Sequence, residues 1–158
     1  MDSYGKLDER NGRYTLTFKR HFANKPKNVF DAVTEPANFV QWYPFATGRM
    51  DLRLGGKIHF DDGEGAEYEA LITELDYPRS FAFREMEDVI ELSFQEETAR
   101  SGSKMVFVHT FDEAEMAMYI AAGWHRCLDV LSQLVHGETV EWKDNSEELR
   151  EIYKEKFN

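Results

Sequence analysis

The chain has 158 residues, a length typical of one domain, and 42% of them are hydrophobic, which excludes an intrinsically disordered chain. Its formal net charge of −11 disfavours binding to nucleic acid or an anionic membrane, because phosphate groups would be repelled. Aromatic residues make up 14%, enough to fill a core and also to line a pocket for an apolar ligand. We expect a single domain over residues 1–158.

Cysteine content and the N-terminal residues bear on the cellular compartment. Cys127 is the only cysteine, so an intrachain disulfide is impossible. The stretch from Met1 to Arg13 is polar and has no apolar signal core, and no apolar run is long enough to insert into a membrane. These features predict a cytoplasmic protein in a reducing environment.

The first predicted elements are a strand and two short helices. Alternating apolar and polar residues from Tyr14 to Phe22 predict a half-buried strand, in which Arg20 interrupts the apolar row. The residues before it are expected to be frayed. Pro26 and Pro36 each open a segment with apolar residues on one helical face, and Pro44 ends the second. Helices inserted early between strands favour an α+β fold.

The middle of the chain predicts six further strands. Gly55-Gly56 has the composition of a tight hairpin turn, and Ser101-Gly102 marks another turn. Short loops between consecutive strands imply an antiparallel meander. The expected strands cover about residues 50–54, 57–61, 67–76, 81–83, 90–94 and 105–111.

A long helix is predicted next. Asp112 and Glu115 have the spacing of a capping box, and an apolar stripe continues to about His136, where Gly137 is expected to stop the helix. Residues 146–157 have helical composition and only a narrow apolar edge, which predicts a last helix that docks weakly.

Five stretches of sequence, in this order, carry a family resemblance over about residues 14–137. The chain resembles the START-like superfamily, also called SRPBCC, with its helix-grip fold. Within it, the chain is most similar to bacterial relatives of the C-terminal domain of the heat-shock-protein-90 ATPase activator. Tyr43 and Ala70 depart from the usual Trp and Gly of the family. The stretches are Leu16-x-Phe18-x-Arg20-x-Phe22 with Pro26-x-x-Val29-Phe30-x-Ala32, Thr34-x-Pro36 with Trp42-x-Pro44-Phe45, Met50-Asp51-Leu52-Arg53-x-Gly55-Gly56, Met105-x-Phe107-x-His109, and Gly123-Trp124-x-x-x-Leu128-x-x-Leu131.

The resemblance implies a curved antiparallel sheet wrapped around the long helix, with an enclosed apolar cavity between them. Relatives in the superfamily use this cavity for lipids, steroids, polyketides and other apolar molecules. Core packing is an equally good explanation for each candidate wall residue. These candidates are Trp42, Phe45, Tyr68, Phe81, Phe83, Phe94, Trp124 and Leu128.

Polar groups at inward strand positions are the second set of candidates. His109 is either a neutral core histidine or a polar anchor in the cavity. Arg20 and Glu74 are either a buried ion pair across the sheet or a site for a polar ligand head. The acidic residues Glu85, Glu87 and Asp88 are expected to form a solvated loop.

Three functions fit these observations. The first is a binding module for a small hydrophobic or amphipathic molecule. The second is an enzyme of cyclase or hydrolase type, with His109 or Glu74 as the acid–base group. The third, implied by the resemblance alone, is a domain that contacts a chaperone. No metal-ligand spacing, phosphate loop, dinucleotide fingerprint or nucleophile motif is present, so we expect no metal or cofactor.

Overall fold

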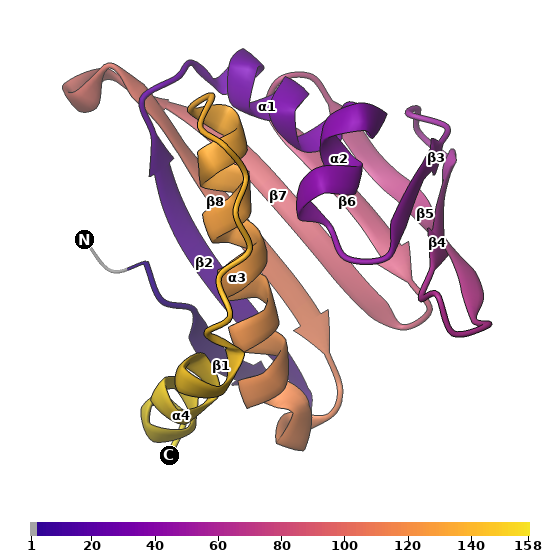
Figure 1. The fold of residues 1–158 in the computed structure, drawn as a ribbon, viewed down its shortest axis with the longest axis vertical. Coiled ribbons are helices and arrows are strands. Elements are labelled where there is room, and N and C mark those ends of the chain that lie inside the picture. Colours follow the sequence, from indigo (N-terminus) through magenta and orange to yellow (C-terminus); the bar gives the residue numbers. More distant parts are fainter. Residues whose placement is uncertain (1–2) are drawn as a thin grey trace.

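A computed structural model describes residues 3–158 and shows one curved antiparallel sheet with helices packed on one face (Figure 1). The eight strands lie in the order β1-β2-β8-β7-β6-β5-β4-β3. The α+β helix-grip prediction is confirmed. The strands are β1 (Lys6–Arg10), β2 (Arg13–Phe22), β3 (Ala46–Met50), β4 (Lys57–Asp61), β5 (Glu67–Asp76), β6 (Ser80–Glu85), β7 (Asp88–Glu97) and β8 (Gly102–Phe111).

Four α-helices complete the fold. Helices α1 (Pro26–Thr34) and α2 (Pro36–Trp42) each begin at a proline, as the sequence predicts. The long helix α3 (Ala117–Val135) crosses the sheet in front of β2 and β8, and the segment after it returns along α3 to α4 (Ser146–Lys156) (Figure 1). Within residues 3–158, no helix is long and apolar enough to cross a bilayer.

The two ends of α3 differ in how well the sequence predicts them. The expected capping box is absent, because Asp112 accepts a hydrogen bond from Nε of Arg13 at 2.6 Å and a short 3₁₀ turn, Ala114–Met116, precedes the helix. At the other end, Gly137 has a φ of 71° and Glu138 donates to the carbonyl of Gln133 at 2.9 Å. This Schellman arrangement confirms the predicted stop.

The N-terminal residues are more ordered than expected. Residues Lys6–Arg10 form β1, which pairs antiparallel with the outer part of β2. Gly5 allows the chain to cross closely over the core, since a Cβ on it would lie 2.6 Å from the ring of Phe18. Its amide donates to the hydroxyl of Tyr153 at 2.9 Å. The expectation of a frayed start is therefore wrong for these residues.

The connection into β4 also differs from the prediction. Strand β3 lies at Ala46–Met50, and residues 51–56 form a loop folded back on itself instead of a tight hairpin. The amide of Gly55 donates to the carbonyl of Ile72 at 2.9 Å, which pins the loop to β5. A Cβ at Gly56 would lie 1.9 Å from the carbonyl oxygen of Asp51, so this turn requires glycine.

Helix α4 docks more firmly than its narrow apolar edge suggests. Tyr153 is completely buried, and Leu149 is nearly so. The hydroxyl of Tyr153 lies 2.8 Å from Nδ1 of His125 on α3 and accepts the amide of Gly5. A single tyrosine thus joins α4, α3 and the N-terminal segment.

Candidate functional site

An apolar pocket of about 400 Å³ opens beside α3, a volume in the range of small-molecule sites. Its walls come from α3, from the corner between α2 and β3 at Pro44 and Phe45, from His109 on β8, and from Trp142 in the segment after α3. The pocket is open to solvent, whereas the sequence resemblance implied an enclosed cavity.

Gly123 forms part of this pocket from the middle of α3. Glycine in a helix interior is about 1 kcal/mol less favourable than alanine. No atom lies within 4 Å of a Cβ built at this position, so the free space over the helix belongs to the pocket. An isolated glycine inside a helical pattern is a signal that the sequence already carries for such a site.

Large apolar side chains are exposed around the pocket. Phe45, Tyr119 and Trp142 line it, while Met86 and Met116 line a neighbouring hollow of about 430 Å³ that shares one residue of α3 with it. Within the described part of the chain, these five are among eight large hydrophobic side chains that are exposed. Their clustering at one place is typical of an interaction site.

Two of these exposed residues have an unfavourable backbone conformation. Phe45 has a φ of 66° and Met86 a φ of 53°, in the left-handed region that bulky side chains rarely adopt. Such a conformation costs roughly 1–2 kcal/mol per residue. Because the side chains are 53% and 82% exposed, burial does not offset this cost. Met86 lies in the two-residue turn between the paired residues Glu85 and Asp88, where hairpin geometry favours a positive φ, so only the strain at exposed Phe45 points to a functional role.

A hydrogen-bonded chain supports the pocket wall at His109. Nε1 of Trp124 donates to Nδ1 of His109 at 2.8 Å, and Nε2 of His109 lies 2.8 Å from Oδ2 of Asp88. The indole nitrogen can only donate, so Nδ1 is the acceptor and Nε2 carries the proton. His109 is therefore neutral, and both of its ring nitrogens are engaged within the protein. Asp88, expected in a solvated loop, is instead part of this chain.

The buried histidines predict a loss of stability in mild acid. Burial lowers the pKa of His109, partly opposed by Asp88, and burial also lowers the pKa of His125. The unfolded chain, with a histidine pKa of about 6.5, then holds more protons than the folded state. The free energy of unfolding should therefore fall as the pH drops below about 6.5, as urea titrations at about pH 8 and about pH 5.5 will show.

A variant of His109 assigns this pH dependence. His109→Asn keeps an acceptor near Nδ1 but cannot titrate, so it should flatten the dependence. Burial and repulsion from Asp88 raise the pKa of Glu85, which acts in the opposite direction and is common to all variants. An unchanged slope in His109→Asn would contradict the neutral assignment of His109.

Glu85 forms a second polar contact near the pocket. The hydroxyl of Tyr43 donates to Oε1 of Glu85 at 2.8 Å, and the Tyr43 ring lies 5.1 Å from that of Trp124. Burial and the Glu85 charge raise the pKa of Tyr43 well above its usual value. The same two causes, with Asp62, raise the pKa of Tyr68 to about 12, so both phenols stay protonated at neutral pH. Glu85 is the last residue of β6, so the prediction that it lies in a solvated loop is wrong.

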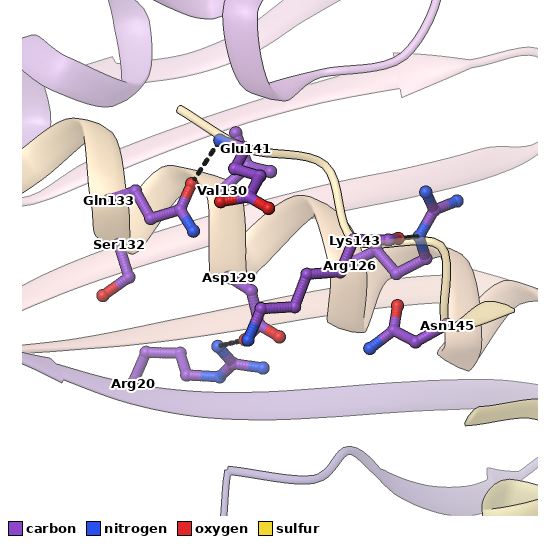
Figure 2. A pocket seen from close by; sticks show the side chains of 9 residues that line it. All are labelled: Arg20, Arg126, Asp129, Val130, Ser132, Gln133, Glu141, Lys143 and Asn145. Carbon is purple, nitrogen blue, oxygen red and sulfur yellow. Dashed lines mark hydrogen bonds and ion pairs between the residues drawn. The ribbon is translucent and has the colours of Figure 1, made fainter. Parts of the chain in front are cut away.

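Arg20 lies in a second, polar pocket of about 190 Å³, and Arg126 lines both this pocket and the apolar one (Figure 2). Its Nη1 donates to Oδ1 of Asp129 at 2.8 Å, and its side chain is 10% exposed against 45% for Asp129. Nε and Nη2 are buried and have no hydrogen-bond partner among residues 3–158. The partner of Arg20 is thus an acid on the long helix.

The predicted Arg20–Glu74 ion pair is wrong. A bulge in β5 between Ile72 and Glu74 places one extra residue in the strand opposite β6. The bulge reverses the alternation, so Leu75 faces Phe81 on the inner side and Glu74 is exposed. Glu74 therefore cannot serve as an acid–base group inside the sheet.

The pocket offers little for nucleophilic catalysis. Cys127 lines it, but burial raises the pKa of its thiol to about 12, so the reactive thiolate is scarcely populated at neutral pH. Among the described residues, no group of three or more His, Cys, Asp or Glu side chains is placed to hold a metal ion.

The family model described as Activator of Hsp90 ATPase homolog 1-like protein matches residues 23–136. The chain belongs to this family. The resemblance seen in the sequence is confirmed, and the match includes all of α3 but not the segment with Trp142. No curated protein gave a significant match.

Solved structures that are similar to this chain share its fold. EF2215, a conserved protein of unknown function from Enterococcus faecalis, has a TM-score of 0.83 at 19% identity over 97% of this chain and 90% of its own. CalU16 from Micromonospora echinospora has a TM-score of 0.75 at 20% identity over 98% of both chains. The Aha1 dimer from Colwellia psychrerythraea has a TM-score of 0.62 at 16% identity over 77% of this chain and 95% of its own.

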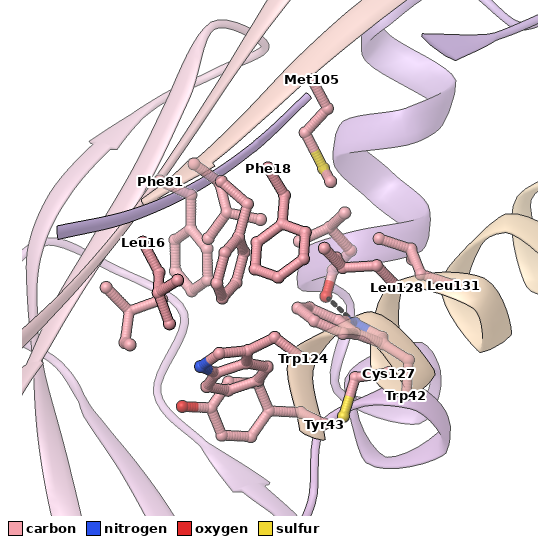
Figure 3. Close-up of a cluster of buried hydrophobic side chains, with 14 of the residues drawn as sticks. Leu16, Phe18, Trp42, Tyr43, Phe81, Met105, Trp124, Cys127, Leu128 and Leu131 are labelled. Carbon is pink, nitrogen blue, oxygen red and sulfur yellow. Dashed lines mark hydrogen bonds between the residues drawn. The ribbon is translucent and has the colours of Figure 1, made fainter. Parts of the chain in front are cut away.

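In this family member, the structure brings three of the ten predicted site residues together at the pocket: Phe45, His109 and Trp124. Figure 3 shows Trp124 among rings that fill the interior between sheet and helices. Arg20 lies in the polar pocket, and Tyr68 is half-buried against Phe60. Ligand contact by any of the ten stays a prediction. The other five, which are buried in the core, are Trp42, Phe81, Phe83, Phe94 and Leu128.

Five residues in or beside the pocket were not predicted as site residues from the sequence: Gly123, Arg126, Trp142, and the two acids Glu85 and Asp88, which were expected in a solvated loop. Arg126 and Trp142 lie 16 residues apart in the sequence, yet the guanidinium lies 5.7 Å from the indole ring centre. No local pattern signals such a contact, because it depends on the path of the segment after α3. Only Gly123 carries a signal that sequence alone provides.

Proposed function

We propose that this domain binds a small hydrophobic or amphipathic molecule in the pocket beside α3. One observation carries the proposal: a pocket of about 400 Å³ runs over a helix glycine and is rimmed by exposed Phe45, Tyr119 and Trp142. A ligand there would remove these rings from water, and each Å² of apolar surface buried contributes about 25 cal/mol. His109 and Trp124 supply the rigid inner wall.

The ligand is proposed to leave the site chemically unchanged. Both nitrogens of His109 are engaged, and the Cys127 thiol is held protonated, so neither is poised for acid–base or nucleophilic chemistry. A cyclase or hydrolase would convert the molecule. Mass spectrometry of a ligand recovered after incubation distinguishes the two, since an enzyme would return a product.

A segment of a partner protein, such as a chaperone, is the second candidate for the same surface. The exposed methionines Met86 and Met116 beside the pocket favour it, because flexible methionines are typical of surfaces that accommodate protein partners. A small-molecule site should saturate with a single apolar probe, whereas a protein-docking surface should show weak binding of such probes.

Gly123→Leu tests the proposed function directly. The new side chain projects into the pocket and meets no protein atom near its Cβ, so it should fill the pocket without disturbing the fold. We expect the affinity for the neutral dye N-phenyl-1-naphthylamine, followed by fluorescence, to fall by on the order of tenfold or more. The free energy of unfolding should rise by about 1 kcal/mol, because glycine is removed from a helix.

Gly123→Ala is the matched control. It should give a similar gain in stability while leaving most of the pocket open, so dye affinity should change little. Equal dye binding by wild type and Gly123→Leu would show that the dye binds elsewhere. Absence of saturable dye binding to the wild type would also overturn the proposal.

A further inference from the structure

We infer that the pocket beside α3 selects an amphipathic organic anion, whose carboxylate or sulfonate head is held by arginine while its apolar body fills the pocket. The inference rests on the proposed function and adds the charge of the ligand to it. Two arginines at the aromatic rim, Arg126 and Arg150, carry the argument.

Arg126 is half-buried and lines the pocket. Its guanidinium carbon lies 5.7 Å from the ring centre of Trp142, and its Nε donates to the backbone carbonyl of Lys143 at 3.1 Å (Figure 2). These contacts fix the guanidinium at the rim. In the described part of the chain, its two terminal nitrogens have neither a hydrogen bond nor a carboxylate partner.

Arg150 reaches the same rim from α4. Its guanidinium carbon lies 5.4 Å from the ring centre of Tyr119, which also lines the pocket. No carboxylate among residues 3–158 forms an ion pair with it. Two of the three exposed rings at the pocket therefore each carry a stacked guanidinium.

Arg126 and Arg150 place positive charge beside exposed rings in a chain of net charge −11. Arg13 pairs with an aspartate, and Arg84 is exposed without an ion pair among the described residues, so it is the position of Arg126 and Arg150 at the aromatic rim that distinguishes them. No acidic side chain lines the pocket within the described residues, and His109 in its wall is neutral. Among the residues that line the apolar pocket, Arg126 is thus the one with a full charge, and that charge is positive.

The position of these guanidinium groups over aromatic rings suits an anion. A guanidinium lying on a ring keeps its N–H groups in its own plane, where they can donate to a planar carboxylate. Nearby apolar walls lower the local dielectric and strengthen the attraction between opposite charges. A neutral ligand that covered Arg126 would remove water from the guanidinium and offer no opposite charge in its place, which is unfavourable. A cation would be repelled.

A pair of dyes with the same body tests the inference. 8-Anilinonaphthalene-1-sulfonate is N-phenyl-1-naphthylamine with one sulfonate added. We expect wild type to bind the anionic dye about tenfold more tightly than the neutral one. Arg126→Gln combined with Arg150→Gln should abolish this preference, measured as the ratio of the two dye affinities in the same variant, whereas Arg126→Lys should retain much of it.

Arg49→Gln combined with Arg84→Gln is the matched control, because both arginines are exposed, on β3 and β6, and lie outside the pocket lining, and their replacement also removes two positive charges. It should preserve the preference. Suppose that wild type binds the neutral dye, that Gly123→Leu weakens this binding, and that wild type binds the anionic dye no more tightly than the neutral one. The proposed function then stands and the anion inference is overturned. The inference is also overturned if the anionic dye still binds tightly to Gly123→Leu, or if it still binds tightly to the variant that lacks both arginines.

Discussion

Trp124→Ala should lower the free energy of unfolding by about 3–5 kcal/mol, the range for deletion of a large buried ring. The indole is 8% exposed and lies 4.8 Å from the ring of Phe107 and 5.1 Å from that of Tyr43. Its removal leaves a void between α3 and β8 and takes the donor away from Nδ1 of His109. Urea unfolding followed by far-ultraviolet circular dichroism measures the loss.

Two tryptophan variants make the result interpretable. Trp142→Ala removes a ring of the same size that is 43% exposed, so it should change stability by less than about 1 kcal/mol. Trp124→Phe keeps most of the ring volume but loses the hydrogen bond, so it should be intermediate. A loss below about 1 kcal/mol for Trp124→Ala would mean that the long helix does not grip the sheet through this residue.

The architecture was predictable from the sequence because strands and helices give periodic patterns of apolar residues. Alternation in Tyr14–Phe22 and in Met105–Phe111 matches two paired strands, in which Phe18 lies opposite Phe107. The prolines that open α1 and α2 and the glycine that ends α3 act through local backbone geometry. Such signals need no knowledge of distant residues.

The partners of polar residues were not predictable, because they depend on register. Three strands separate β5 from β2, so Glu74 is out of reach of Arg20, and an extra residue in β5 also turns Glu74 outward; nothing in the local sequence marks the strand order or the bulge. Asp88 and Glu85 looked like a solvated turn, yet pairing of β6 with β7 places them beside His109 and Tyr43. The sequence shows which residues are acidic, but the residues that they contact depend on how the strands pair.

The Arg20–Asp129 ion pair should respond unequally to the loss of either partner. Arg20 is 10% exposed in its side chain, and Asp129 is 45% exposed. Removal of Asp129 leaves a buried guanidinium without a carboxylate, whereas removal of Arg20 leaves an aspartate that water can solvate. The exposure difference, and not the shared 2.8 Å contact, determines which variant is less stable.

We expect Asp129→Ala to lower the free energy of unfolding by about 3 kcal/mol and Arg20→Met by about 1 kcal/mol. The double variant should recover to within about 1 kcal/mol of wild type, since methionine at position 20 lies opposite Met105 on β8 and buries no charge. Urea unfolding at about pH 8, where His125 beside Asp129 is neutral, isolates the pair. Equal losses in the two single variants, or additive losses in the double variant, would show that the buried charge of Arg20 does not depend on Asp129.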